Sequence, residues 1–162
     1  MSELMSSELS HVDASGKAIM VDVSGKSESQ RSASAQVCIR MSPDAREALE
    51  RHQGPKGDPV QVARVAAIMA VKRTAELIPM CHPLRLSEVA VDVHLESWGA
   101  KVLVRVQALE RTGVEMEALH GASVAALTLF DMLKAVDPTM QIGDLYVLEK
   151  RGGRRGHYRA SD

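Results

Sequence analysis

A long run of small and apolar residues, with charged residues near both ends, constrains the fold of this chain more than any other feature. The run is TGVEMEALHGASVAALTLFDMLKAV, residues 112–136, and its pattern predicts a helix. Thr112 and Glu115 have the spacing of a capping box at its start, and Pro138 follows its end. Because apolar side chains cover nearly the whole circumference, we expect this helix to be buried on all sides.

Charged residues lie at both ends of this predicted helix. Asp131 and Lys134 are close enough in sequence to pair, and burial would make either charge costly without its partner. Glu115 and Glu117 have an ordinary explanation, because acidic residues stabilise a helix N-terminus; a catalytic role is the alternative. At about 1.5 Å per residue, Glu117 and Asp131 are about 21 Å apart along the axis. One small reacting centre within a single chain cannot contact both.

Composition limits the class of protein. The chain has 162 residues, of which 45% are hydrophobic and 25% charged, which suits one soluble domain. Its net charge of −1 offers no overall attraction to nucleic acid or to an anionic membrane. Two cysteines, the absence of a signal-peptide pattern and the lack of a long apolar run indicate a reducing compartment. We therefore expect a cytoplasmic protein with no nucleic-acid and no membrane partner.

Strand and helix patterns alternate along the rest of the chain. Strands are predicted at 18–23, 35–41, 87–96, 101–109 and 141–150, and helices at 42–52, 59–77 and 112–136. From residue 35 onward, the strands and the two long helices follow the order βαββαβ, which is typical of the ferredoxin-like fold. We expect an α+β protein with an antiparallel sheet packed by two long helices and an N-terminal strand extension. Residues 11–157 are predicted to form one domain, with flexible termini at 1–10 and 158–162.

A rigid turn and a charged loop supply further candidate residues. Cys81 and His82 lie in IPMCHPL, where the two prolines restrict the backbone. They could be buried structural residues, half of a metal site, or an acid-base histidine beside a thiol. A structural zinc site is disfavoured because no second Cys-His pair lies nearby in the sequence. Lys56 lies just before a predicted helix N-terminus, which Asp58 is expected to cap.

Basic residues near both termini offer possible anion contacts. Lys26 and Arg31 lie in the polar segment SGKSESQRSASA, which is predicted to be an exposed loop. We interpret both as solvated side chains, with anion binding as the alternative. The C-terminal RGGRRGHYRASD is glycine-rich and basic, but the chain has few aromatic residues to stack on bases. A mobile flap or a local phosphate clamp is therefore favoured over nucleic-acid contact.

Three segments together resemble one known family. They are KGDPVQVARVAAIMAVKRTAELIPMCHPL, TGVEMEAL and DMLKAVD. From about residue 11 to 157 the chain is similar to the cyclic pyranopterin monophosphate synthases, the molybdenum cofactor biosynthesis protein C family. The resemblance implies a lyase that converts (8S)-3′,8-cyclo-7,8-dihydroguanosine 5′-triphosphate to cyclic pyranopterin monophosphate and pyrophosphate. It also implies a ferredoxin-like subunit within a homohexamer.

The resemblance assigns site residues as well. Catalytic positions fall on Asp131, Lys134, Lys56 and His82, and substrate-binding positions on Cys81, His82, Glu115, Met116, Glu117 and Lys150. Outside this carried-over set, Arg73 is a further substrate-binding candidate. A lysine with a lowered pKa can carry protons near neutrality, so the two catalytic lysines are the acid-base candidates, with Asp131 orienting Lys134. Arg73 and Lys150 are expected to bind the triphosphate.

Cofactor needs and the assembly follow from the same reasoning. Proton transfer and attack on a phosphate need no redox cofactor, so we expect none beyond Mg²⁺ accompanying the triphosphate, and we assign no metal ligands. Because the helix ends are about 21 Å apart, we expect sites shared between two chains, and the resemblance extends this dimer to a trimer of dimers.

Two other functional classes are weighed against this expectation. One is a metal-dependent hydrolase with Cys81, His82, Glu115 and Glu117 as ligands, since their chemistry permits metal binding. The other is a non-catalytic nucleotide or RNA-binding protein, which ferredoxin-like sheets often provide, although the predicted strands carry a single aromatic residue, Tyr146.

Overall fold

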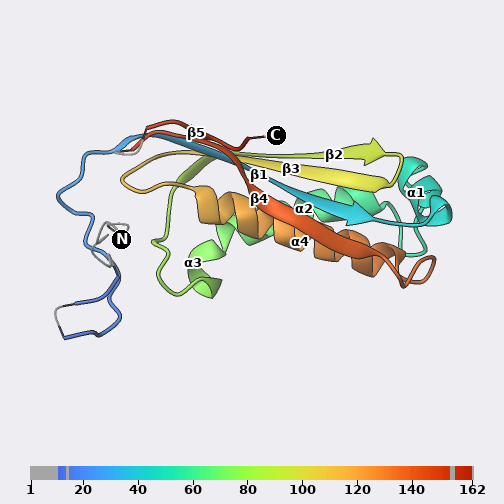
Figure 1. Ribbon diagram of the computed structural model, residues 1–162, viewed down its shortest axis with the longest axis horizontal. Helices are drawn as coiled ribbons and strands as arrows, with labels where there is room; N and C mark the ends of the chain where they lie inside the picture. The colour runs from blue at the N-terminus through green and yellow to red at the C-terminus, as the bar shows by residue number, and fades with distance from the viewer. Residues whose placement is uncertain (1–10, 14, 154–155, 162) are drawn as a thin grey trace, which may run out of the picture.

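An antiparallel sheet covered on one face by helices forms the body of the protein (Figure 1). The computed structural model describes residues 11–13, 15–153 and 156–161. Its strands are β1 (Ser29–Arg40), β2 (Leu86–Glu96), β3 (Gly99–Glu110), β4 (Gln141–Arg151) and β5 (Tyr158–Arg159), and its helices are α1 (Pro43–Glu50), α2 (Pro59–Lys72), α3 (Thr74–Leu77) and α4 (Glu115–Leu133). The strand order β2-β3-β1-β4-β5 is the ferredoxin-like order with β5 added at one edge. The predicted fold class is confirmed.

Small side chains make the core, and they let α2 and α4 pack closely together against the sheet. Alternate residues of β1 and β3 point at the helices and are fully buried, among them Val37 and Val104. Gly121 of α4 lies where the two helices and the sheet meet, and a Cβ there would be 2.6 Å from Cγ2 of Val71. Only glycine fits this contact without a shift of its neighbours.

The two long helices are buried on one side only, so the expectation of a helix buried all round is wrong for the single chain. Leu127 of α4 is 60% exposed and Val65 of α2 is 58% exposed. The helices form a single layer, so their outer faces are left uncovered by the rest of the described chain (Figure 1). Asp131 and Lys134 lie on this uncovered side with about half of each side chain exposed, so they are not the buried charges we expected.

The helix ends also differ in part from the predictions. Helix α4 begins at Glu115 after Val114 with no side-chain capping bond, so the predicted capping box does not form, and it ends at Leu133. The helix expected over 59–77 is divided at Arg73 into α2 and α3. The predicted cap of α2 is confirmed, since the Asp58 carboxylate accepts hydrogen bonds from the backbone N–H groups of Val60 and Gln61.

The segments before β1 and after β4 depart most from the predictions. Residues 18–23 form no strand and make only an isolated bridge between Ala18 and Val12. Strand β1 begins at Ser29 rather than at residue 35, which places Arg31 in the sheet instead of in a loop. At the other terminus Tyr158–Arg159 pairs with β4, where we had predicted only a flexible end. The mobility predicted for residues 1–10 concerns residues outside those described.

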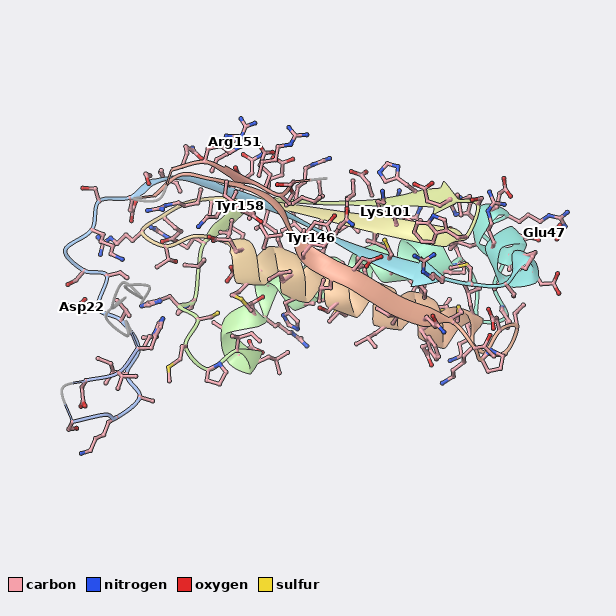
Figure 2. The ribbon with its side chains drawn as sticks, in the orientation of Figure 1. Asp22, Glu47, Lys101, Tyr146, Arg151 and Tyr158 are labelled. Carbon is pink, nitrogen blue, oxygen red and sulfur yellow. The ribbon has the colours of Figure 1, made fainter. Side chains whose placement is uncertain are left out.

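Helix α4 spans the molecule and connects its two ends. Its N-terminus lies near α3 and the N-terminal segment, and its C-terminus lies near α1 (Figure 1). Figure 2 shows Asp22 of the N-terminal segment at one end and Glu47 of α1 at the other. Within the described residues, none of the helices combines the length and the apolar character needed to cross a membrane.

Candidate functional site

The predicted site residues gather in two clusters at opposite ends of α4. One cluster, which we call the carboxylate cluster, contains Cys81, His82, Glu115, Met116, Glu117 and Lys150. The other, the lysine cluster, contains Lys56, Asp131 and Lys134. Arg73 belongs to neither, because it lies between α2 and α3 beside an apolar depression that also includes Leu77 and His120. A single chain therefore brings together each half of the predicted site, but not the whole.

The carboxylate cluster opens into a cavity of about 410 Å³. We call it the ring cavity, after the guanine-derived ring of the substrate that the sequence resemblance implies. Its lining includes Val21, Met80, Cys81, His82, Leu84, Met116 and Glu117. Glu117 is only 4% exposed, and burial, followed by the negative charge of Glu115, raises the pKa of its carboxyl. A raised pKa favours the protonated acid, which can donate a hydrogen bond as well as accept one.

The rigid Cys-His turn delivers both side chains to this cavity. His82 Nε2 lies 2.8 Å from the carbonyl oxygen of Val21. A carbonyl only accepts, so Nε2 donates this bond, and Nδ1 is the ring nitrogen left available to a ligand. Burial, followed by the negative charge of Glu117, raises the pKa of the Cys81 thiol, which therefore remains protonated. Cys81 thus suits a polar contact better than a nucleophilic role.

A second cavity of about 440 Å³ adjoins the ring cavity and contains mainly basic side chains; we call it the cationic chamber. Its cations are Lys26, Arg31, Arg111, Lys150 and Arg151. Within the described part of the chain, Nε of Arg111 is a buried nitrogen with no hydrogen-bond partner. A cavity with converging cations and an unsatisfied buried donor suits a polyanionic ligand.

The sequence interpretation missed most of this chamber. Lys26 and Arg31 line the chamber, which favours the anion-binding alternative over solvated side chains, and no sequence pattern points to Arg111. Arg31 is held in place by the sheet: Nε donates to the carbonyl of Glu110 and an Nη donates to the carbonyl of Arg111, both at 3.1 Å. Gly153 gives a sequence signal for this region, since its φ of 82° is a backbone conformation that favours glycine, and the Arg31 guanidinium lies beside it.

Glu115 lies at the boundary between the two cavities and lines both. Its Oε1 accepts a hydrogen bond from Lys150 Nζ at 2.9 Å, and the two side chains are 29% and 26% exposed. The carboxylate folds back over Gly113, occupying the space that a side chain at residue 113 would need. Glu115 therefore forms an ion pair that crosses from α4 to β4, instead of the predicted capping interaction.

The lysine cluster is a carboxylate held between two ammonium groups. Asp131 accepts from Lys56 Nζ at 2.7 Å and pairs with Lys134 Nζ at 2.8 Å, which confirms the predicted Asp131–Lys134 pair. The hydrogen bonds from Lys134 and then Lys56 lower the pKa of Asp131 to about 2. Lys56 reaches this position because paired backbone hydrogen bonds between Gly54 and Gly57 close its loop.

The Asp131 carboxyl gives a direct test of this cluster. We expect its pKa to be about 2 in the wild type and to return towards 3.8 in a Lys56→Met/Lys134→Met variant, measured by NMR titration. Because the folded-state pKa is depressed, any stability from this group is present above about pH 4 and is lost as pH falls towards 2. Lys72→Met, which removes an exposed lysine at the end of α2, should leave the titration unchanged. A wild-type pKa near 3.8 would contradict the cluster.

The metal-dependent hydrolase alternative gains no support from the geometry. Among the residues that the structure describes, no three His, Cys, Asp or Glu side chains are grouped so as to hold a metal ion. Cys81, His82, Glu115 and Glu117 share the ring cavity. The Glu115 carboxylate, however, is paired with Lys150 Nζ, and Nε2 of His82 is hydrogen-bonded to the carbonyl of Val21. Neither atom is free to bind a metal ion without breaking that contact.

Comparison with known proteins agrees with the sequence resemblance. The profile of the MoaC family matches residues 20–153. Proteins named cyclic pyranopterin monophosphate synthase from Brucella ovis, Brucella melitensis and Brucella abortus are each 47% identical over 162 residues, covering 98% of this chain and 97% of the relative. A match of this extent leaves no substantial part of the chain outside the comparison. The chain belongs to the MoaC family.

Proposed function

We propose that this protein converts (8S)-3′,8-cyclo-7,8-dihydroguanosine 5′-triphosphate to cyclic pyranopterin monophosphate and pyrophosphate, a lyase step of molybdenum cofactor biosynthesis. The observation that carries the proposal is the adjacency of the ring cavity and the cationic chamber, whose linings share Lys26 and Glu115 among other residues. A ligand with a heterocycle at one end and phosphates at the other fits such a pair of cavities.

The ring cavity suits the guanine-derived part of this substrate. A guanine-type ring presents N–H donors on adjacent atoms, and carboxylates are suitable acceptors for them. Glu115 and Glu117 supply carboxyl groups from the first turn of α4, while Met116 belongs to the same turn. The thiol of Cys81 and Nδ1 of His82 complete a polar lining that can bind the ring and exchange protons with it.

The cationic chamber suits the triphosphate. In the proposed reaction a sugar hydroxyl oxygen bonds to the first phosphorus, the bond from that phosphorus to its bridging oxygen breaks, and pyrophosphate leaves with the electron pair. The hydroxyl proton passes to a base of the site. Lys150 and the arginines of the chamber are placed to stabilise the negative charge that develops on the leaving group. Arg73 is remote from this chamber in the single chain, so its role as a phosphate ligand requires a second subunit.

The lysine cluster is proposed to supply proton transfer from a second chain. Helix geometry separates Glu117 and Asp131 by about 21 Å, and in an antiparallel twofold pair of α4 helices each carboxylate end would approach the partner's lysine end. The outer faces of α2 and α4 support such a pair, because Val65, Met69 and Leu127 are exposed there.

We extend this dimer to a cytoplasmic homohexamer, a trimer of dimers, with two sites at each dimer interface. Hydrodynamic mass measurement tests the assembly directly.

Magnesium is proposed to arrive with the triphosphate rather than in a site built by the protein. Within the described residues no cluster of three ligands is available to hold it, and Mg²⁺ is commonly bound through substrate phosphates. No redox cofactor is required by the proposed bond changes. Turnover measured with and without a chelator tests this part.

Pyrophosphate release from purified substrate is the test of the function. Wild-type protein should release one pyrophosphate per substrate consumed, with cyclic pyranopterin monophosphate as the other product identified by mass spectrometry. Glu117→Gln serves as a control variant that keeps the size of the ring-cavity side chain and should lose turnover. Folded wild-type protein that leaves fresh substrate unchanged in the presence of magnesium would refute the proposal.

A further inference from the structure

We propose that Glu115 determines specificity by withholding Lys150 from phosphate until a ring with N–H donors occupies the ring cavity. This inference rests on the proposed function, because it assigns the ring cavity and the cationic chamber to two parts of one ligand. It adds that the two cavities are coupled and that the Glu115–Lys150 ion pair couples them.

The position of Glu115 is the first support. Its carboxylate lines both cavities, and its ion pair with Lys150 has an N–O distance of 2.9 Å. Both side chains are more than two-thirds buried, so the ammonium has limited access to solvent. The carboxylate can fold back to this position because residue 113 is glycine. Lys150 is therefore neutralised by its partner while both cavities are open.

The partners of the other cations are the second support. Arg31 donates to backbone carbonyls of Glu110 and Arg111, which carry no net charge. Arg151 pairs with Glu149, a residue that does not line the chamber. Among the described residues that line the chamber, Glu115 is the one that carries a carboxylate, and this carboxylate is paired with Lys150. A polyphosphate entering the chamber meets both an occupied ammonium and a negative charge.

An exchange of partners resolves this conflict for the right ligand. Ring N–H groups in the ring cavity can donate to Glu115 in place of Lys150, and the released ammonium can then bind phosphate oxygens. Glu117 is the weaker acceptor of the two carboxyl groups, since burial favours its protonated form. A ligand with phosphates alone must break the ion pair without compensation, so it binds more weakly.

Titration of the intact protein with inorganic tripolyphosphate tests the coupling. Glu115→Gln, which keeps the shape but loses the charge and the ion pair, should bind tripolyphosphate roughly three- to tenfold more tightly than wild type. The same substitution should give a clearly smaller gain in a Lys150→Ala background, because only the charge of Glu115 is removed and no ammonium remains to be released. In a Lys26→Ala background, which removes a different cation of the same chamber, the gain should persist.

Two outcomes of the titration would overturn the inference. An equal gain in the Lys150→Ala background would show that Glu115 acts by simple charge repulsion, and the absence of any gain would show that it does not restrain Lys150 at all. Guanosine provides the second readout: it should raise the tripolyphosphate affinity of wild type and leave that of Glu115→Gln unchanged. An unchanged wild-type affinity at the highest soluble guanosine concentration would overturn the ring-dependent step.

The titration tests the coupling and the turnover assay tests the proposed reaction, so the failure of one proposal can be distinguished from the failure of the other. Wild-type turnover of the cyclised substrate without the expected tripolyphosphate pattern would refute the coupling and leave the proposed function intact. The expected binding pattern without turnover would refute the proposed reaction and leave the ion pair as the control on phosphate binding.

Discussion

Lys134→Ala is expected to lower kcat by about 10²- to 10⁴-fold, the usual contribution of a positioned acid or base. Lys134 Nζ is held 2.8 Å from the Asp131 carboxylate, so the side-chain nitrogen has a fixed position. The side chain is about half exposed, so loss of such a solvent-screened pair should change the free energy of unfolding little. Pyrophosphate release and thermal unfolding of the same sample measure the two effects separately.

Asp131→Ala provides the companion measurement. From the sequence we expected it to destabilise the protein by leaving a buried ammonium without a partner, but Lys56, Asp131 and Lys134 are all about half exposed. The revised expectation is therefore a strong loss of turnover with little loss of stability. Lys72→Ala is the control, because it removes an exposed lysine outside the lysine cluster. Near-normal turnover of Lys134→Ala would refute the acid-base assignment.

Mixing two inactive variants is expected to restore activity. Glu115→Gln disables the carboxylate end of α4 and Lys134→Ala disables the opposite end. If every site combines the carboxylate end of one chain with the lysine end of its partner, a mixed interface contains one intact site and one doubly defective site. Random pairing makes about half of the interfaces mixed, so activity should return to about one quarter of wild type. The measurement is pyrophosphate release after the two variants are unfolded and refolded together.

A second mixture controls for nonspecific recovery. Glu115→Gln and Glu117→Gln both disable the carboxylate end, so no pairing of these two variants regenerates an intact site, and the mixture should remain inactive. Native mass spectrometry with one variant isotopically labelled establishes that the subunits have exchanged. Persistent inactivity of the first mixture despite proven exchange would show that Glu115 and Lys134 act from the same chain.

Local sequence signals were sufficient for the order of elements and for many of their ends. The alternation of apolar residues in β2 and β3 and the Asp58 cap of α2 are set by neighbours within a few residues, and the structure agrees with both. The βαββαβ order then leaves few compact arrangements, which is why the sheet order could be anticipated. The split of the expected 59–77 helix at Arg73 is a smaller local difference.

Some site residues could likewise be predicted from local sequence signals, whereas the burial of others could not. Cys81 and His82 were found from a rigid proline-flanked turn, and the pair of Asp131 with Lys134 from their spacing on one helix. Both signals are local. The burial predicted for Asp131 was wrong, because apolar residues all round a helix mean burial only when something covers every face, and in one chain the outer face of α4 is uncovered.

Contacts between distant segments were decided only by the tertiary structure. Lys56 meets Asp131 across 75 residues of sequence, and Lys150 meets Glu115 across 35. The cationic chamber gathers Lys26 and Arg111 with Lys150 because β1 begins, and β3 and β4 end, near the start of α4. Periodicity and capping report on neighbours within a turn or two, whereas such pairs depend on the register and packing of whole elements. The sequence therefore determined the elements and the chemical types of the site residues, and the packing of the sheet on α4 decided which of them meet.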